Sequence, residues 1–300
     1  MFLPTYDLQL RDIKSVAAST VATINCPKGQ RYRRITLTLG DTSAGNTNAP
    51  AVSAIVDEIQ VTLGSKVIRR LTGAQLDYLN TLNGAQYGSY GVAGAGNGGG
   101  RTYLPIYFEE PWRKRADFQN GLAVETGWLD ANGVFQVTVK LQAGITPVLA
   151  AVAIVDDFSS GKANPIMKYF SDDAGTPNSA TLDLSNIFQG NTPSDLIESI
   201  TLFDPSDSVA QSKQVTVARL MLNGKAVVDD VTVDQMTAKL KGADMNPAVG
   251  AYPIVFDHDD LFESLRQISS ISASQLTLTF KAASNGTIRR VTQRLGDPTL

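Results

Sequence analysis

Cysteine and histidine are scarce in this sequence, whose 300 residues include one of each. The single cysteine, Cys26, excludes an intrachain disulfide, which fits assembly in a reducing cytoplasm. Histidine-dependent chemistry can draw only on His258, and the motifs CxxC, HExxH and GxSxG are absent. We therefore expect no catalytic residue. Cys26 is expected to be a buried, inert thiol, with a Cys26–His258 catalytic pair as the alternative.

Long apolar runs and a strong net charge are also missing. The longest apolar stretch, Val148–Val155, fits one buried strand and is far shorter than the roughly 20 residues of a membrane span. Residues 1–14 lack the basic-then-apolar order of a signal peptide, so we expect no secretion by that route. The net charge of −3 gives no general attraction to nucleic acid, and we expect no sequence-specific nucleic-acid partner.

Strand signals dominate what is present. Apolar and polar residues alternate with period two in several segments rich in β-branched residues, which predicts half-buried strands. Tight hairpin turns are expected at Leu63–Lys66 and Leu222–Lys225, because glycine and Asn-Gly supply the positive φ of two-residue turns. Two helices are expected to begin near Thr72 and Thr232, each with threonine as N-cap. The alternating segments are Ile35–Leu39, Ile59–Leu63, Val134–Val139, Val215–Val217 and Leu276–Phe280.

The order of these features occurs twice in the chain. The hairpin and helix start at Val61–Leu76 match Leu220–Met236, and three further strand segments match in the same order. An internal duplication explains this order, whereas chance similarity among β-rich segments would not place a helix in the same slot of each half. The further matches are Ile35–Leu37 with Ile200–Leu202, Tyr103–Phe108 with Ala251–Phe256, and Gln136–Val139 with Gln275–Leu278.

The two halves differ in their loops. The offset between matched residues falls from 159, between Lys66 and Lys225, to 139, between Val137 and Leu276. Most of the fall crosses the glycine-rich segment Gly84–Gly100, which we expect to be a flexible surface loop. A phosphate-binding loop is disfavoured there, because a helix precedes the segment and a strand follows it.

Two domains of about 150 residues are the usual solution for a chain of this length. We predict an all-β protein built from two tandem eight-stranded antiparallel jelly rolls, each with a short helix. The expected N-terminal jelly roll spans residues 1–157 and includes an arm at 1–20. Residues 158–193 are expected to connect it to a C-terminal jelly roll at 194–300.

The opening segment Leu8–Gly40 carries a family resemblance. It leads through Val-Ala-Ala, a cysteine and a Pro-x-Gly-Gln turn into the first sandwich strand. Together with Val56–Leu82 and Val217–Leu240, it resembles the double-jelly-roll major capsid proteins of membrane-containing icosahedral bacteriophages, and the corticovirus-type coat protein most of all. The likeness lies in order and spacing, and it does not extend to the glycine-rich loop or to Phe158–Pro193.

This resemblance implies a non-enzymatic coat protein that forms homotrimers of pseudo-sixfold outline. The trimers would tile an icosahedral virion shell over an internal lipid membrane. The implied partners are other copies of the chain, penton or spike proteins, membrane proteins of the virion and lipid headgroups. The implied location is the virion capsid, after synthesis in the host bacterial cytoplasm. No cofactor is required, and calcium is an optional ligand that capsids of this type can use.

Two polar clusters are candidates for ligand contacts. Asp257, Asp259 and Asp260 are weak calcium candidates, because they supply hard oxygen ligands on a loop after a strand. Their spacing is not that of a dedicated calcium loop, so a solvated acidic loop is the favoured alternative. Basic residues near the N-terminus could face anionic lipid headgroups, with subunit contacts or plain solvation as the alternative. These membrane-facing candidates are Arg11, Lys14, Arg31, Arg33 and Arg34.

The segment after the expected strand at Tyr103–Phe108 supplies further candidates. Trp112, Arg113 and Arg115 are candidate subunit contacts, because Trp and Arg are favoured interface anchors. An ordinary loop is the alternative. Glu109–Glu110 could suggest a glycosidase dyad, but adjacent side chains on an extended chain point apart.

Two rival functions stay open. The first is a phage or cell-surface β-sandwich protein that binds a receptor or carbohydrate, with Tyr87, Tyr90 and Trp128 as sugar platforms. The second is a jelly-roll enzyme acting on glycans through Glu109 or Glu110. Stable trimers and shells would separate the coat protein from the binding protein, and glycan turnover would mark the enzyme.

Overall fold

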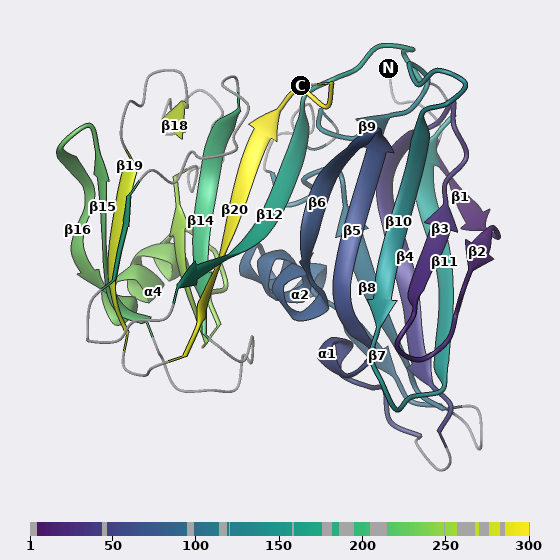
Figure 1. Ribbon diagram of the computed structural model, residues 1–300, viewed down its shortest axis with the longest axis horizontal. Helices are drawn as coiled ribbons and strands as arrows, with labels where there is room; N and C mark the ends of the chain where they lie inside the picture. Colours follow the sequence, from purple (N-terminus) through teal and green to yellow (C-terminus); the bar gives the residue numbers. More distant parts are fainter. Residues whose placement is uncertain are drawn as a thin grey trace. The chain divides into compact units, whose positions relative to one another are not determined.

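The computed structural model divides the chain into two compact units, each of them rich in strands (Figure 1). The first unit holds most of the chain up to Met167, and the second holds most of it from Lys168 to Gly296. At 182–185 and 268–269 only the backbone is described. The described residues are 5–43, 47–94, 99–113, 119, 121–157, 159–175, 182–185, 195–204, 215–248, 250–256, 268–269, 276–282 and 286–299.

The first unit is a sandwich of two antiparallel sheets. The Tyr32 ring of one sheet lies 4.7 Å from the Phe135 ring of the other, and Phe108 lies 5.6 Å from Phe135. The sheets therefore share one aromatic core. One sheet has the order β1 (Thr5–Leu10), β11 (Pro147–Asp156), β4 (Arg31–Asp41), β8 (Arg101–Tyr107), β7 (Tyr90–Val92), with β9 (Val124–Glu125) paired to β4. The other has the order β6 (Lys66–Thr72), β5 (Val56–Gly64), β10 (Val134–Leu141), β3 (Val21–Asn25), β2 (Ile13–Lys14).

The second unit is a sandwich of the same kind. Its buried cluster takes Ile200 and Ile254 from one sheet and Leu220, Leu278 and Phe280 from the other. The first of these sheets has the order β17 (Ala251–Val255), β14 (Leu196–Phe203), β20 (Ile288–Gly296), β12 (Ile166–Gly175), with β18 (Ile268–Ser269) paired to β14. The second has the order β13 (Leu182–Ser185), β19 (Leu276–Ala282), β15 (Val215–Leu222), β16 (Lys225–Thr232).

Both units have the strand order of a jelly roll. Counted along each unit, the first, eighth, third and sixth main strands form one sheet, and the second, seventh, fourth and fifth form the other. The short strands β2, β7, β9 and β18 are additions to this plan. The predicted pair of tandem jelly rolls is therefore confirmed. The main strands are β1, β3, β4, β5, β6, β8, β10 and β11 in the first unit, and β12, β13, β14, β15, β16, β17, β19 and β20 in the second.

The two predicted hairpins form as their turn residues dictate. Gly64, the last residue of β5 before the turn to β6, has φ +66°, and Asn223 and Gly224 have φ +49° and +80° between β15 and β16. Positive φ at these positions gives the turn a twist that matches the flanking strands. Each hairpin leads into a helix, α2 (Gly73–Leu82) in the first unit and α4 (Val233–Gly242) in the second.

Both helices begin with the predicted threonine N-cap, and in each the threonine is part of a capping box. The backbone N of Gln75 donates to Thr72 Oγ1 at 3.1 Å, and the backbone N of Thr72 donates to Gln75 Oε1 at 3.0 Å. Thr232 and Gln235 form the equivalent pair. This reciprocal arrangement satisfies two backbone donors at each helix start. The short helix α1 (Val52–Ile55) was not predicted.

Strand registers confirm the repeat and correct one of its matches. Thr36 lies opposite Pro105 in the first unit, and the matched Thr201 lies opposite Pro253 in the second. At the other sheet, Val137 of β10 corresponds to Leu278 of β19, not to Leu276 as the sequence match has it. Val137 lies opposite Val61 of β5, and Leu278 lies opposite Leu220 of β15, the residue that matches Val61. A slip of two residues leaves every side chain on its face, so the alternation alone could not reveal it.

The glycine-rich segment is not a loop throughout. It contains a short 3-10 helix, η1 (Ala85–Tyr87), and strand β7, which pairs with β8. Tyr90 of β7 stacks on Tyr103 with ring centroids 4.9 Å apart. Strand pairing uses backbone groups that glycine also has, so a glycine-rich composition does not prevent it. Residues 95–98 of the segment lie outside the described residues.

The predicted connection at 158–193 also contains strands. Both β12 and β13 fall within it, and each is a main strand of the second jelly roll. The buried part of β12 is continuous rather than alternating, which hides it from a search for period-two patterns.

Candidate functional site

Three of the predicted lipid-facing arginines lie at the start of β4, beside a β-bulge. Arg33 is the extra residue, because Tyr32 and Arg34 face consecutive residues of β11. The bulge lets Tyr32 and Ile35 both point into the core although they are three positions apart. A regular strand would place them on opposite faces.

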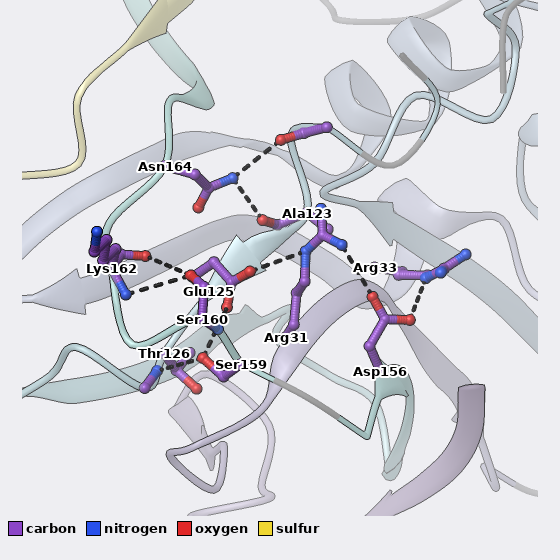
Figure 2. A network of polar contacts seen from close by, with 12 residues as sticks. Arg31, Arg33, Ala123, Glu125, Thr126, Asp156, Ser159, Ser160, Lys162 and Asn164 are labelled. Atoms are coloured by element: carbon purple, nitrogen blue, oxygen red, sulfur yellow. Dashed lines mark hydrogen bonds and ion pairs between the residues drawn. The ribbon is translucent and has the colours of Figure 1, made fainter. Parts of the chain in front are cut away.

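The carboxylate of Asp156, the last residue of β11, holds two of these arginines (Figure 2). Its Oδ1 lies 2.6 Å from Arg33 Nε and its Oδ2 lies 3.3 Å from Arg31 Nη1. The Asp156 side chain is 0% exposed. A carboxylate this deeply buried needs opposite charges and hydrogen bonds in place of water. The two arginines therefore act inside the subunit, where they join the start of β4 to the end of β11.

Glu125 of β9 extends this network to the segment that follows β11 (Figure 2). Its Oε1 lies 3.1 Å from Arg31 Nε, and its Oε2 accepts hydrogen bonds from Ser159 Oγ at 2.7 Å and the Ser160 backbone N at 3.0 Å. Asn164 Nδ2 donates to the carbonyl oxygen of Ala123 at 2.8 Å. These bonds fasten residues 159–164 to β9.

Glu109 lies at the edge of the same network, with Oε2 3.8 Å from Arg33 Nη1. Burial raises the pKa of the Glu109 carboxyl, and the charges of Arg33 and Arg34 oppose that shift. The guanidinium carbon of Arg34 lies 5.7 Å from the centroid of the Tyr107 ring, within cation–π range. Arg34 is thus held against the protein, as Arg31 and Arg33 are.

The second unit repeats the bulge with the opposite charge. In β14 the extra residue is Glu198, because its two neighbours face consecutive residues of β20. The carbonyl oxygen of Glu198 accepts a hydrogen bond from the backbone N of Phe256 at 3.0 Å, as that of Arg33 does from Phe108 at 2.8 Å. The bulge is therefore a duplicated structural feature, and the charge of its side chain is not what forms it.

A buried charge cluster also lies near this bulge, in the sheet of the second unit that contains β14. Lys168 Nζ of β12 lies 3.2 Å from Oδ1 of Asp195, and both side chains are buried. The Arg294 guanidinium lies 5.3 Å from the Phe170 ring, and burial lowers the pKa of Arg294. Strands β14 and β20 of the second unit correspond to β4 and β11 of the first. In the first unit the arginines lie on β4 and the carboxylate lies on β11. In the second unit the carboxylate of Asp195 precedes β14, and the cations lie on β12 and β20, so the positions of the charges are exchanged.

The structure separates the five lipid-facing candidates into two groups. Arg11 and Lys14 are exposed, and Lys14 Nζ lies 3.8 Å from Asp12 Oδ1. Arg31 and Arg33 keep 18% of their side chains exposed and pair with carboxylates. Sequence reasoning missed those partners because they lie about 100 residues further along, and the basic cluster itself carries no signal of them.

The predicted subunit-contact residues also differ from one another. Arg113 is buried, with Nε 2.9 Å from Oε2 of buried Glu110, so its ion pair lies inside the subunit. Trp112 is partly exposed and packs edge-to-face against Tyr87 and Tyr107. Arg115 lies outside the described residues. Glu109 and Glu110 have separate arginine partners and form no shared site.

Cys26 is buried, as predicted, at 6% exposure. Burial raises the pKa of its thiol to about 12, so the thiol is protonated and unreactive at neutral pH. The calcium candidates Asp257, Asp259 and Asp260, together with His258, lie outside the described residues. Within the described ranges no group of three or more His, Cys, Asp or Glu side chains is placed to hold a metal ion. Among those residues, too, no helix is long and apolar enough to cross a membrane.

The aromatic residues proposed as sugar platforms have different neighbours. Trp128 lines an open cavity of about 340 Å³ beside the β5–β6 hairpin, with Lys66 and Asp130 in its wall. Its indole Nε1 donates to the Glu125 carbonyl oxygen at 2.7 Å. Tyr87 packs instead against Trp112, and Tyr90 stacks on Tyr103.

Solved capsid proteins share this fold over nearly the whole chain. The major capsid protein P2 of bacteriophage PM2 has a TM-score of 0.74 and 16% identity, with 98% of each chain covered. The capsid of the virus PBCV-1 gives a TM-score of 0.68 and 11% identity, covering 98% of this chain and 93% of that one. The protein from Sulfolobus Turreted Icosahedral Virus gives 0.66 and 12%, covering 98% and 90%. At such low identity these likenesses establish the fold, a double jelly roll.

Sequence comparison supplies the family. No curated protein matches the chain significantly. Residues 7–159, just over half of the chain, match the family described as the viral coat protein P2 N-terminal domain. The matched range contains the first jelly roll with its bulge and the Asp156 network. The chain belongs to this family of viral coat proteins, whose place is the capsid of the virion.

Proposed function

We propose that this chain is the major capsid protein of an icosahedral virion, which it builds as homotrimers of pseudo-sixfold outline. The observation that carries the proposal is the repeated strand order, with matched registers, in the two jelly rolls. Three chains with two similar blocks each present six similar blocks around one axis. Closed symmetric assembly is the usual outcome for such subunits.

The buried charged residues of the first jelly roll fit a structural role in the proposed coat protein. The buried carboxylates of Asp156, Glu125 and Glu110 each have an arginine partner within the subunit. Neighbouring trimers, and penton or spike proteins at the vertices, are the partners that a shell of this kind requires. Calcium is an optional ligand in the proposal, and calorimetric titration of the trimer with calcium alone tests it.

Negative-stain microscopy together with light scattering tests the main proposal. We expect the purified protein to have the mass of a trimer of 32.1 kDa subunits and to form particles of hexagonal outline. A protein that stays monomeric at all concentrations and forms no shells or sheets with its own copies would contradict it.

The proposal extends to an internal membrane beneath the shell. Of the basic residues considered, Arg11 and Lys14 have exposed side chains that could meet anionic headgroups. Each basic residue near such a surface contributes about 1 kcal/mol. We expect the trimer to float with vesicles containing anionic phosphatidylglycerol, and the double variant Arg11→Glu, Lys14→Glu to float less. Lys239→Glu, an exposed lysine of α4, is the control. Equal flotation of all three proteins would count against the lipid contact.

A further inference from the structure

Strand β11 has a composition that its surroundings in one subunit do not explain. Its residues from Pro147 to Val155 are apolar throughout. Continuous apolar runs are typical of strands buried on both faces, whereas strands with one wet face alternate. In this subunit only every second side chain is buried in the sandwich. The buried set is Leu149, Ala151, Ala153 and Val155.

The outer face of β11 is nevertheless apolar. Four side chains there, which we call the apolar stripe, are partly exposed: Val148, Ala150, Val152 and Ile154. On the neighbouring β4, Thr36 lies opposite Val152 and Thr38 lies opposite Ala150. The middle of this sheet face therefore carries methyl-bearing side chains and no charge.

The opposite sheet of the same unit shows what an outer face in contact with water looks like. On β10 the outward side chains Gln136, Thr138 and Lys140 are polar. They pair with Thr62, Gln60 and Glu58 of β5, which are polar too. The apolar stripe is thus a property of one face and not of the unit as a whole.

In the second jelly roll the centre of the matching face is buried. Thr36 lies opposite Val152 in the first unit, and the matched Thr201 lies opposite Val291 in the second. Val291 is therefore the counterpart of Val152. Thr201 and Val291 are both 0% exposed. One copy of the repeat therefore buries the centre of this face, and the other leaves it partly open.

The open face is large enough for a stable contact. The ten residues of β11 at about 3.3 Å each, and four strands about 4.8 Å apart, give an area of roughly 600 Å². Stable protein–protein interfaces bury about 600–1,000 Å² on each partner, so this face reaches the lower end of that range. Charged Asp7 and Arg34 flank Ile154 at one end of the stripe. An apolar centre with a polar rim is the usual anatomy of an interface.

We propose that the apolar stripe of β11 is a subunit interface, on which a second copy of this chain packs. The proposal rests on the proposed coat function, because a shell subunit has to bury surface against its own copies. It goes further by naming the face of the first jelly roll that does so. Burial against a second copy accounts for the continuous apolar run in β11.

A charge placed in the stripe tests the proposal. Val152→Lys puts an unpaired ammonium group at the centre of the interface, and Thr138→Lys puts the same group on the outer face of the other sheet. Both side chains are partly exposed in the subunit and lie on inner strands of their sheets. We expect wild type and Thr138→Lys to sediment as oligomers. Val152→Lys is expected to associate at least about 100-fold more weakly, since an uncompensated buried charge is strongly unfavourable.

The possible outcomes distinguish failure of the proposed interface from failure of the proposed coat function. An unchanged oligomer of folded Val152→Lys would overturn the interface while leaving the coat function standing. Dissociation of both lysine variants would also overturn it, because the stripe would then have no special role. A wild-type protein that never associates would contradict the coat function itself.

Thiol labelling provides a second measurement if Val152→Lys does not fold. Val152→Cys adds one small thiol to a chain whose native Cys26 is buried and has a raised pKa, so Cys26 contributes little background. Maleimide is expected to label the Val152→Cys variant slowly in the oligomer and at least about tenfold faster after dissociation by dilution, since the interface excludes solvent. Equal labelling rates in the two states would overturn the proposal.

Discussion

Asp156 supplies a fully buried charge that two arginines of the first jelly roll share. Asp156→Asn keeps the shape of the side chain and leaves Arg31 and Arg33 without their shared, fully buried partner. Breaking a buried ion pair costs about 3–5 kcal/mol, because the remaining charge is desolvated and unpaired. We expect a loss near the lower figure, since both arginines keep a second carboxylate nearby. Urea unfolding followed by circular dichroism measures it.

The matched control is the surface pair of Arg70 and Glu58, which are 3.0 Å apart with 60% and 35% of their side chains exposed. Exposed pairs contribute about 1 kcal/mol at most. Glu58→Gln should therefore change the stability far less than Asp156→Asn. Similar losses from the two variants would show that burial is not what makes the Asp156 pair important.

Glu109 gives the same network a pH dependence. Burial raises its folded pKa above the unfolded value of 4.5, so the protonated form contributes stability that is fully present below that value. As pH rises, the unfolded chain ionises first, and this contribution is lost through the folded pKa. We expect Glu109→Gln to gain stability relative to wild type between pH 4 and 8 in denaturant titrations. If the difference in unfolding free energy between the variant and wild type stays constant with pH, or moves in favour of wild type as pH rises, this assignment is contradicted.

At the scale of elements, the β15–β16 hairpin isolates a backbone effect. Gly224 has φ +80°, and a Cβ there would meet no atom within 4 Å, so Gly224→Ala adds strain without a clash. Placing an L-residue in this region costs about 1–2 kcal/mol. Gly242 at the end of α4 is equally open but has no positive φ, so Gly242→Ala should be neutral or stabilising. Chemical denaturation of both variants checks the contrast, and equal effects would refute the role of φ.

Elements specified by near neighbours in sequence were predictable, and those specified by distant partners were not. Both hairpins and both threonine N-caps depend on residues within four positions of each other, and they formed as predicted. The bulge at Arg33 depends on pairing with β11, more than 100 residues away. The basic cluster therefore looked free to meet lipid, although Asp156 and Glu125 occupy two of its arginines. Strand β7 was missed because its pairing uses backbone rather than side-chain pattern.

At the scale of the whole molecule, each jelly roll has its own core, so damage to one should leave the other folded. Phe280→Ala removes a fully buried ring from the second cluster, and Phe135→Ala removes one from the aromatic core of the first. A Phe→Ala change in a core costs about 3–5 kcal/mol.

Calorimetry on the two variants tests this independence. We expect two unfolding transitions, with Phe280→Ala lowering one midpoint and Phe135→Ala lowering the other, because each substitution removes packing from a single sandwich. Duplication makes this separation physically reasonable, since an ancestral single unit must already have closed its own core. If both variants instead shift one common transition by similar amounts, the two cores unfold together. The repeat would then be one cooperative structure despite its two separate sets of sheets.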